Sequence, residues 1–195
     1  VEYMGLHYFQ AERFNAAQMV TYMFMHDPYS FGHVFFNMFS VFIFGRTLEM
    51  VWGGKRFLVF YIITGLGAGL IQEITWYLSL HEAIAHTEAA IGWEHTQMML
   101  NNIITIGASG AVFGILLAFG MLFPNAELFL MFIPIPIKAK YFVIGYGLIE
   151  LFLGLRSSSG GGDNIAHFAH LGGMLFGLIL ILYWRKKGGS RNGYF

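Results

Sequence analysis

Two long stretches of this chain contain no charged residue, and this feature restricts the fold more than any other. Residues Ile103–Phe123 and Ile165–Trp184 hold no Asp, Glu, Lys or Arg. Each has about the 20 residues that an α-helix needs to cross a hydrocarbon core of ~30 Å. Three further apolar stretches, bounded by charge, Gly or Pro, are Phe31–Trp52, Phe57–Leu78 and Tyr141–Leu155. The pattern predicts an all-α, polytopic bundle of five membrane helices.

The composition argues against a soluble protein. The chain is 56% hydrophobic and 11% charged, whereas soluble proteins average about 25% charged residues. A soluble helical protein would need more polar surface than this to cover its buried helices. No basic cluster is large enough to bind nucleic acid, and the absence of Cys excludes thiol chemistry.

The basic residues indicate the orientation of the bundle, because Lys and Arg collect in cytoplasmic loops. If the five segments alternate in direction, nine of the 11 basic residues fall on one side and only Arg13 and Arg156 on the other. We therefore expect a cytoplasmic C-terminus. For the location of this multi-pass protein, we expect a bacterial inner (plasma) membrane. The nine are Arg46, Lys55, Arg56, Lys138, Lys140, Arg185, Lys186, Lys187 and Arg191.

The rest of the chain is expected to form a single domain with these helices. We expect an interfacial loop over residues 1–28, a helical core over 29–185 and a cytoplasmic tail over 186–195. Helical spacing without a basic residue over residues 79–101 predicts an external amphipathic segment lying on the membrane. Two connections are also predicted: an apolar turn over Leu128–Ile137, and a flexible external loop over Ser157–Gly162, placed to act as a lid.

Polar side chains at membrane depth are costly and mark functional sites. Such residues are His33 and Asn37 in the first segment, Ser109 in the third, and His167 and His170 in the fifth. At a rise of ~1.5 Å per residue, His33, Ser109 and His170 each lie ~20–22 Å from the cytoplasmic end of their segment. This common depth predicts one site below the outer face of the membrane.

Small residues indicate how two of these segments meet. Gly110 and Gly114 form a GxxxG pattern, as do Gly173 and Gly177. Such faces let helix backbones approach closely in lipid. Close approach would bring the Oγ atom of Ser109 within hydrogen-bond reach of His170, and an adjacent histidine base is what activates a serine nucleophile.

His33 and Asn37 lie four residues apart, on one face of a helix. Both side chains can donate hydrogen bonds, which a developing oxyanion requires. The backbone N–H of Ser109 would add a third donor if a helix begins near that residue.

These polar residues and glycines have two alternative explanations, namely ordinary structural roles and metal binding. A lone Ser usually bonds its own helix, GxxxG usually serves packing, and an intramembrane His can serve a proton path or a metal site. The HEAIAH stretch separates His81 and His86 by ~140° around a helix, so we expect no zinc there. His167 and His170 could hold a metal, but no carboxylate is expected nearby. We therefore expect His167 to pack or hydrogen-bond beside His170, with neither metal nor cofactor.

These motifs resemble those of the rhomboid intramembrane serine proteases. The matching stretches are GASG around Ser109, AHLGG around His170 with Gly177 following, and HVFFNMF around His33 and Asn37. The RTLEMVWGG stretch that starts at Arg46 is also similar. The resemblance implies a core of six helices, and we expect the first of them to have no counterpart in the chain as given.

The resemblance implies that Ser109 is the nucleophile and His170 the general base of a dyad without an acidic third member. It also implies that His33, Asn37 and the Ser109 amide form the oxyanion hole. Phe113 takes the place where the family often has a Tyr stacked on the catalytic His. The other supporting residues are Gly107, Gly110, Gly173 and His167. No Asp or Glu is expected near the dyad.

The implied function is hydrolysis of peptide bonds in or near transmembrane segments, with a membrane-protein substrate and the lipid bilayer as partners. Two rival functions remain. One is a non-catalytic relative that binds membrane clients, but such proteins lack the Ser or the His. The other is a small transporter with a proton relay through His33, His167 and His170, in which Ser109 would have no role.

Overall fold

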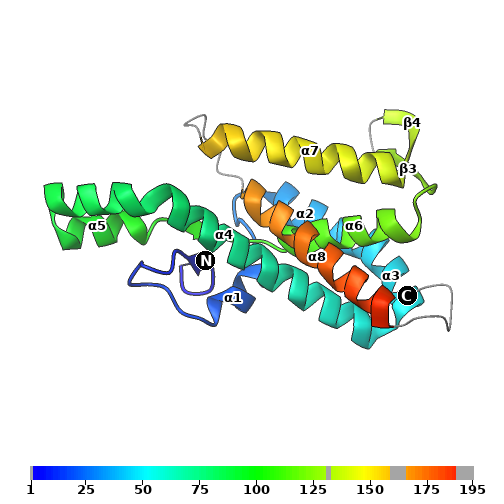
Figure 1. Ribbon diagram of the computed structural model, residues 1–195, viewed down its shortest axis with the longest axis horizontal. Coiled ribbons are helices and arrows are strands. Elements are labelled where there is room, and N and C mark those ends of the chain that lie inside the picture. Colours follow the sequence, from blue (N-terminus) through cyan, green and yellow to red (C-terminus); the bar gives the residue numbers. More distant parts are fainter. Residues whose placement is uncertain (1, 131–132, 159–165, 188–195) are drawn as a thin grey trace.

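The computed structural model describes residues 2–130, 133–158 and 166–187, and most of them are helical (Figure 1). The all-α bundle predicted from the apolar segments is confirmed. Among the described residues, three helical stretches are long and apolar enough to cross a membrane, namely Phe31–Trp52, Gly54–Ile91 and His167–Lys187, and Ser109–Leu122 is a shorter apolar helix. The larger helices are α2 (Phe31–Ser40), α3 (Arg46–Trp52), α4 (Gly54–Ile91), α5 (Trp93–Leu100), α6 (Ser109–Leu122), α7 (Ala139–Ser158) and α8 (His167–Lys187).

Helices α2 and α3 form one rod, because a π-helical turn over Val41–Gly45 joins them. The smaller elements are β1 (Leu6–His7), α1 (Gln18–Thr21), a 3-10 turn (Tyr22–Phe24), β2 (Ile104–Thr105), β3 (Glu127–Leu130) and β4 (Ile133–Lys138).

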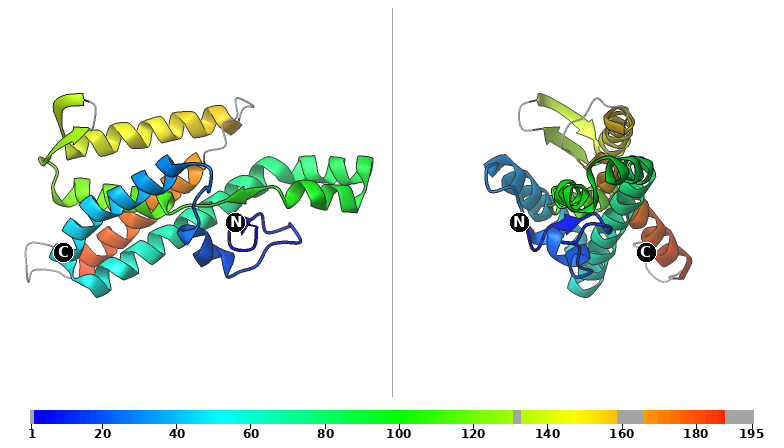
Figure 2. Two further views of the ribbon diagram at one scale, coloured as in Figure 1. Left: turned by 180° about the vertical axis from the view of Figure 1, so that it is seen from behind. Right: turned by 90° about the vertical axis from the view of Figure 1, so that its left-hand side faces the viewer.

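Helix α4 is much longer than the sequence predicted. It was expected to end at Leu78 but continues to Ile91, so at 38 residues it is about 57 Å long and exceeds a ~30 Å core. The stretch after Leu78 holds no Gly or Pro and is rich in Ala and Glu, which favour a helix. Gly92, with φ +81°, ends it and reverses the chain into α5. The predicted surface segment is instead a helical hairpin that extends beyond the bundle (Figures 1 and 2).

The N-terminal residues are more than an interfacial loop. Strand β1 pairs with β2, with Leu6 opposite Thr105. Leu6, Tyr22 and Met23 are buried, and the Tyr22 hydroxyl donates to the Gly65 carbonyl oxygen of α4 at 2.7 Å. This pairing also explains why the third predicted segment starts late, since its first residues form β2.

The other connections differ in part from the predictions. The expected turn at Leu128–Ile137 contains the antiparallel strands β3 and β4, with Glu127 opposite Lys138. Helix α7 continues through Ser158, so the first residues of the predicted external loop are helical. The rest of that loop lies outside the described residues, as do Ile165 and the tail beyond Lys187.

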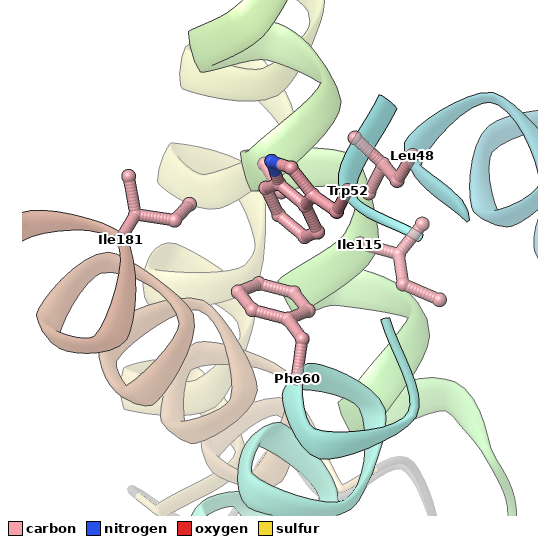
Figure 3. Close-up of a cluster of buried hydrophobic side chains, with 6 residues drawn as sticks. Leu48, Trp52, Phe60, Ile115 and Ile181 are labelled. Carbon is pink, nitrogen blue, oxygen red and sulfur yellow. The ribbon is translucent and has the colours of Figure 1, made fainter. Parts of the chain in front are cut away.

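The hydrophobic core joins four helices. Leu48 and Trp52 of α3, Phe60 of α4, Ile115 of α6 and Ile181 of α8 pack together (Figure 3). The start of α4, the end of α6, the β3–β4 hairpin and the end of α8 all lie at one end of the molecule (Figure 1). The predicted basic side therefore corresponds to one end of the bundle.

Glycines bring α4, α6 and α8 into close contact. A Cβ atom built on Gly173 of α8 would overlap the carbonyl oxygen of Gly110 on α6. One turn further on, a Cβ atom at Gly177 would lie 3.4 Å from the Cα atom of Gly114. Helix α4 completes the contact through Ala68, whose methyl group would overlap a Cβ atom at Gly110. The two GxxxG faces therefore meet each other, as their spacing predicted.

We predict that Gly173→Val lowers the free energy of unfolding by about 3 kcal/mol, the upper range for overpacking, because backbone atoms obstruct the new side chain. Thermal unfolding in detergent measures the change. Gly145→Val is the matched control, since no described atom outside the local backbone of its own helix lies within 4 Å of a Cβ atom at that membrane-helix glycine. Equal melting temperatures for the two variants would contradict the close contact.

Candidate active site

Ser109 and His170 meet where α6 and α8 begin. Ser109 is the first residue of α6, and His170 lies in the first turn of α8. The Nε2 atom of His170 lies 2.8 Å from the Oγ atom of Ser109, and the histidine is 8% exposed. The contact lies beside Gly110 and Gly173, where the two backbones are closest. A hydroxyl hydrogen-bonded to an imidazole is the arrangement from which a serine nucleophile is activated.

A buried glutamate completes this arrangement, and the expectation that no Asp or Glu lies nearby is wrong. Glu150 of α7 is 4% exposed, and its Oε2 atom lies 2.8 Å from the Nδ1 atom of His170. The same oxygen lies 2.7 Å from the Nδ1 atom of His167. Glu150 is also the only charged residue of the predicted segment Tyr141–Leu155. The rule that ionisable residues in membrane helices are functional could therefore have identified it.

The carboxylate determines which nitrogen of His170 carries the proton. A carboxylate can only accept hydrogen bonds, so the Nδ1 atom of His170 is the donor to Glu150. In the neutral ring the Nε2 atom is then unprotonated and accepts the hydrogen bond from the Ser109 hydroxyl. This is the tautomer that a general base facing Ser109 requires.

His167 contacts the same oxygen of the Glu150 carboxylate as His170 does. It is 2% exposed and donates its Nδ1 hydrogen to Glu150. The two imidazole rings are perpendicular, with centroids 6.3 Å apart. The predicted hydrogen-bonding role of His167 beside His170 therefore acts through Glu150.

Phe113 stacks on the ring of His170. The centroids are 4.3 Å apart and the planes are inclined by 7°. Phe113 lies one turn after Ser109 on α6, so the helix that carries the hydroxyl also supports the face of the imidazole. The stack restricts rotation of the ring away from Ser109.

His33 and Asn37 of α2 lie on one helical face, near the start of α6. The backbone N–H of Asp27 donates to the Nδ1 atom of His33 at 3.3 Å, so the neutral ring carries its hydrogen on Nε2. The side-chain amide of Asn37 donates to the His33 carbonyl oxygen at 2.8 Å, which uses one of its two hydrogens. His33 Nε2 and the second amide hydrogen of Asn37 are therefore candidate oxyanion donors.

Gly107 occupies the space between His33 and Ser109. Its φ of +124° is a conformation that side chains rarely adopt. A Cβ atom at this position would lie 2.7 Å from His33 Nε2 and 3.7 Å from Ser109 Oγ. A side chain at this position would displace the His33 ring from its place near the Ser109 hydroxyl. Because α6 begins at Ser109, the backbone N–H of Ser109 also has no partner within the helix.

The geometry of Glu150, His167 and His170 fits hydrogen bonding better than metal binding. Their ligand atoms lie within 4.8 Å of one another, so the cluster could in principle hold an ion. Ligands around zinc, at bonds of about 2.0–2.1 Å, would stand roughly 3.3 Å apart. The contacts of 2.7 and 2.8 Å are instead hydrogen-bond distances. The residues His81, Glu82 and His86 are all exposed on α4.

Comparison with known proteins identifies related chains. The family model described as a rhomboid domain matches residues 13–187. RHOMBOID-like protein 12, mitochondrial, of Arabidopsis thaliana is 31% identical over 157 residues, which are 80% of this chain and 43% of that protein. Rhomboid protein 1, mitochondrial, of Saccharomyces cerevisiae is 29% identical over 157 residues, 80% of this chain and 39% of that protein. Rhomboid protease AarA of Providencia stuartii is 28% identical over 161 residues, 77% of this chain and 50% of that protein. The matched part of the chain thus spans about two fifths to one half of these relatives.

We predict that Gly107→Ala slows labelling of Ser109 by a serine-directed fluorophosphonate at least about tenfold, because the methyl group displaces His33 and strains the backbone by ~1–3 kcal/mol. Labelling rates of the purified protein measure this effect. Gly53→Ala is the control. Gly53 also has a positive φ (+80°), but apart from its chain neighbours no described atom lies within 4 Å of its Cβ position. If labelling slows equally in both variants, backbone strain alone explains the slower labelling.

Proposed function

Because this chain belongs to the rhomboid family, we propose that it is an intramembrane serine endopeptidase in which Ser109 and His170 carry the chemistry. A relative named a rhomboid protease supports intramembrane proteolysis as the general activity. The observation that carries the proposal for this chain is the hydrogen bond of 2.8 Å between His170 Nε2 and Ser109 Oγ. A non-catalytic relative would lack one of these two residues.

In the proposed reaction, His170 removes the proton of Ser109 as the Oγ atom attacks the scissile carbonyl carbon. The C–N bond then breaks, and His170 returns the proton to the leaving amine. Water attacks the resulting ester in the second half of the reaction, with His170 again acting as the base. The substrate segment leaves as an acid and Ser109 is regenerated.

The developing oxyanion would be bound by donors from two elements. Helix α2 contributes the side chains of His33 and Asn37, and the start of α6 contributes the backbone N–H of Ser109. Preformed donors are most effective where water is scarce, because no solvent has to reorganise during the reaction. The region between Ser109 Oγ and His33 Nε2 is the proposed position of the oxyanion.

The proposed substrate is a membrane protein whose transmembrane helix can unwind locally. A closed helix uses its carbonyl groups in its own hydrogen bonds, so a scissile bond in such a helix is not accessible. The proposed partners are therefore the membrane-protein substrate and the lipid bilayer.

Apolar helices and the family identify the chain as a membrane protein. We further propose a bacterial plasma membrane with the C-terminus on the cytoplasmic side. The basic end of the bundle supports this orientation under the positive-inside rule. A relative from Providencia stuartii supports a bacterial location, although other relatives are named mitochondrial.

We predict that Ser109→Ala and His170→Ala each abolish cleavage of a transmembrane reporter while the protein remains folded. The pair acts as a unit, so a double variant should be no less active than either single variant. Gel analysis of reporter cleavage in proteoliposomes measures the loss.

Ser79→Ala is the matched control for the serine variant. The Ser79 hydroxyl donates to the Thr75 carbonyl oxygen of its own helix, a contact that involves neither Ser109 nor His170, so cleavage should be unchanged. Full activity of Ser109→Ala would overturn the proposed function. It would favour the rival proton relay, to which the buried Glu150, His167 and His170 could belong.

We predict that Asn37→Ala lowers kcat by less than the ~10²–10³ measured for a single oxyanion donor elsewhere, because three donors are proposed. His33→Ala should have an equal or larger effect. Steady-state cleavage of the same reporter measures both. An unchanged kcat in the variant that carries both substitutions would show that α2 contributes no oxyanion donor.

A further inference from the structure

We infer that Glu150 is a positioning residue for His170, so that the reaction uses a chain of four side chains rather than an isolated Ser–His pair. The order is Ser109, His170, Glu150 and His167. The inference rests on the proposed function, since positioning a base matters only if Ser109 is the nucleophile.

The side chain of Glu150 contacts the proposed base directly. Its Oε2 atom is within 2.8 Å of the one ring nitrogen of His170 that does not face Ser109. Each nitrogen of the imidazole is thus held by a different helix: Nε2 by α6 and Nδ1 by α7. With Phe113 stacked on its face, the ring is fixed in both orientation and tautomer.

Burying the Glu150 carboxylate among apolar helices costs free energy. This cost argues that its contact with His170 is not incidental. An ionised group among apolar helices is disfavoured unless it is well satisfied by hydrogen bonds or opposite charge. Two N–H groups donate to the Oε2 atom of Glu150. His167 thereby keeps the carboxylate in place next to His170.

Glu150 also has an electrostatic role in the proposed reaction. His170 becomes an imidazolium when it takes the proton of Ser109, and a carboxylate 2.8 Å away stabilises that charge. The carboxylate itself stays ionised, so no additional proton transfer is required.

A purely structural role is the competing explanation, because the same hydrogen bonds connect α7 to α8. Removal of such a connection would lower thermal stability, but it would not slow the chemical step alone. The experiment must therefore separate kcat from KM and from stability.

The test compares Glu150→Gln and Glu150→Asp with wild type in proteoliposomes that contain the transmembrane reporter. Glu150→Gln should lower kcat by ~10²–10⁴ with KM within about threefold, by analogy with the loss of the carboxylate in other serine hydrolases. Glu150→Asp keeps the charge and should recover part of that loss. Glu73→Gln is the matched control, because Glu73 is also a buried glutamate but accepts the Phe9 backbone N–H, away from Ser109.

A kcat for Glu150→Gln within twofold of wild type, while Ser109→Ala is inactive, would overturn this inference and leave the proposed function intact. No cleavage by wild type would instead overturn the proposed function. If Glu150→Gln does not fold, nitrogen-15 NMR of histidine-labelled wild type provides the test. A proton on Nδ1 of His170 supports the inference, and a neutral ring protonated on Nε2 overturns it.

Discussion

The backbone contact between α6 and α8 at Gly110 and Gly173 is the interaction on which the site depends. Two helices in lipid gain nothing from excluding water, so their approach is determined by packing. With no side chain at either glycine, the two backbones touch, and the residues that flank the glycines come within hydrogen-bond distance. Ser109 directly precedes one glycine and His170 lies three residues before the other. The geometry of the pair therefore follows from backbone contact, which is less variable than contact between long side chains.

The polar groups of the site are acceptable inside an apolar bundle because they satisfy one another. The Ser109 hydroxyl, the two imidazoles and the Glu150 carboxylate form one connected chain of hydrogen bonds. A partly satisfied network would be worse than an apolar core, because each unpaired group carries its full desolvation cost. The chain also spans α6, α8 and α7, so these hydrogen bonds support the packing of three helices.

The sequence allowed part of this structure to be predicted, and the limits have physical causes. Ser109 and His170 could be paired because both lie next to glycine motifs at the same depth. The stacking of Phe113 followed from the family resemblance and its place one turn after Ser109. Glu150 was missed because depth was compared only among segments running in one direction, and α7 runs the other way. The end of α4 was missed because apolar length predicts where a helix leaves the membrane, whereas the helix itself continues to Gly92.

The two supports of His170 differ in kind. On the α6 side the glycine contact leaves no room for adjustment, since even a Cβ atom at Gly173 would overlap the backbone. On the α7 side the close contacts are made by side chains: Met174 approaches a Cβ position at Gly147 to 3.2 Å, and Phe168 approaches one at Gly154 to 3.1 Å. Packing against α7 therefore acts through side chains and not through direct contact of two backbones. The hydrogen bonds of Glu150 to His170 and His167 supply the directional contact that apolar packing lacks. The orientation of the proposed base thus depends on a polar contact within the membrane as well as on the backbone contact of two helices.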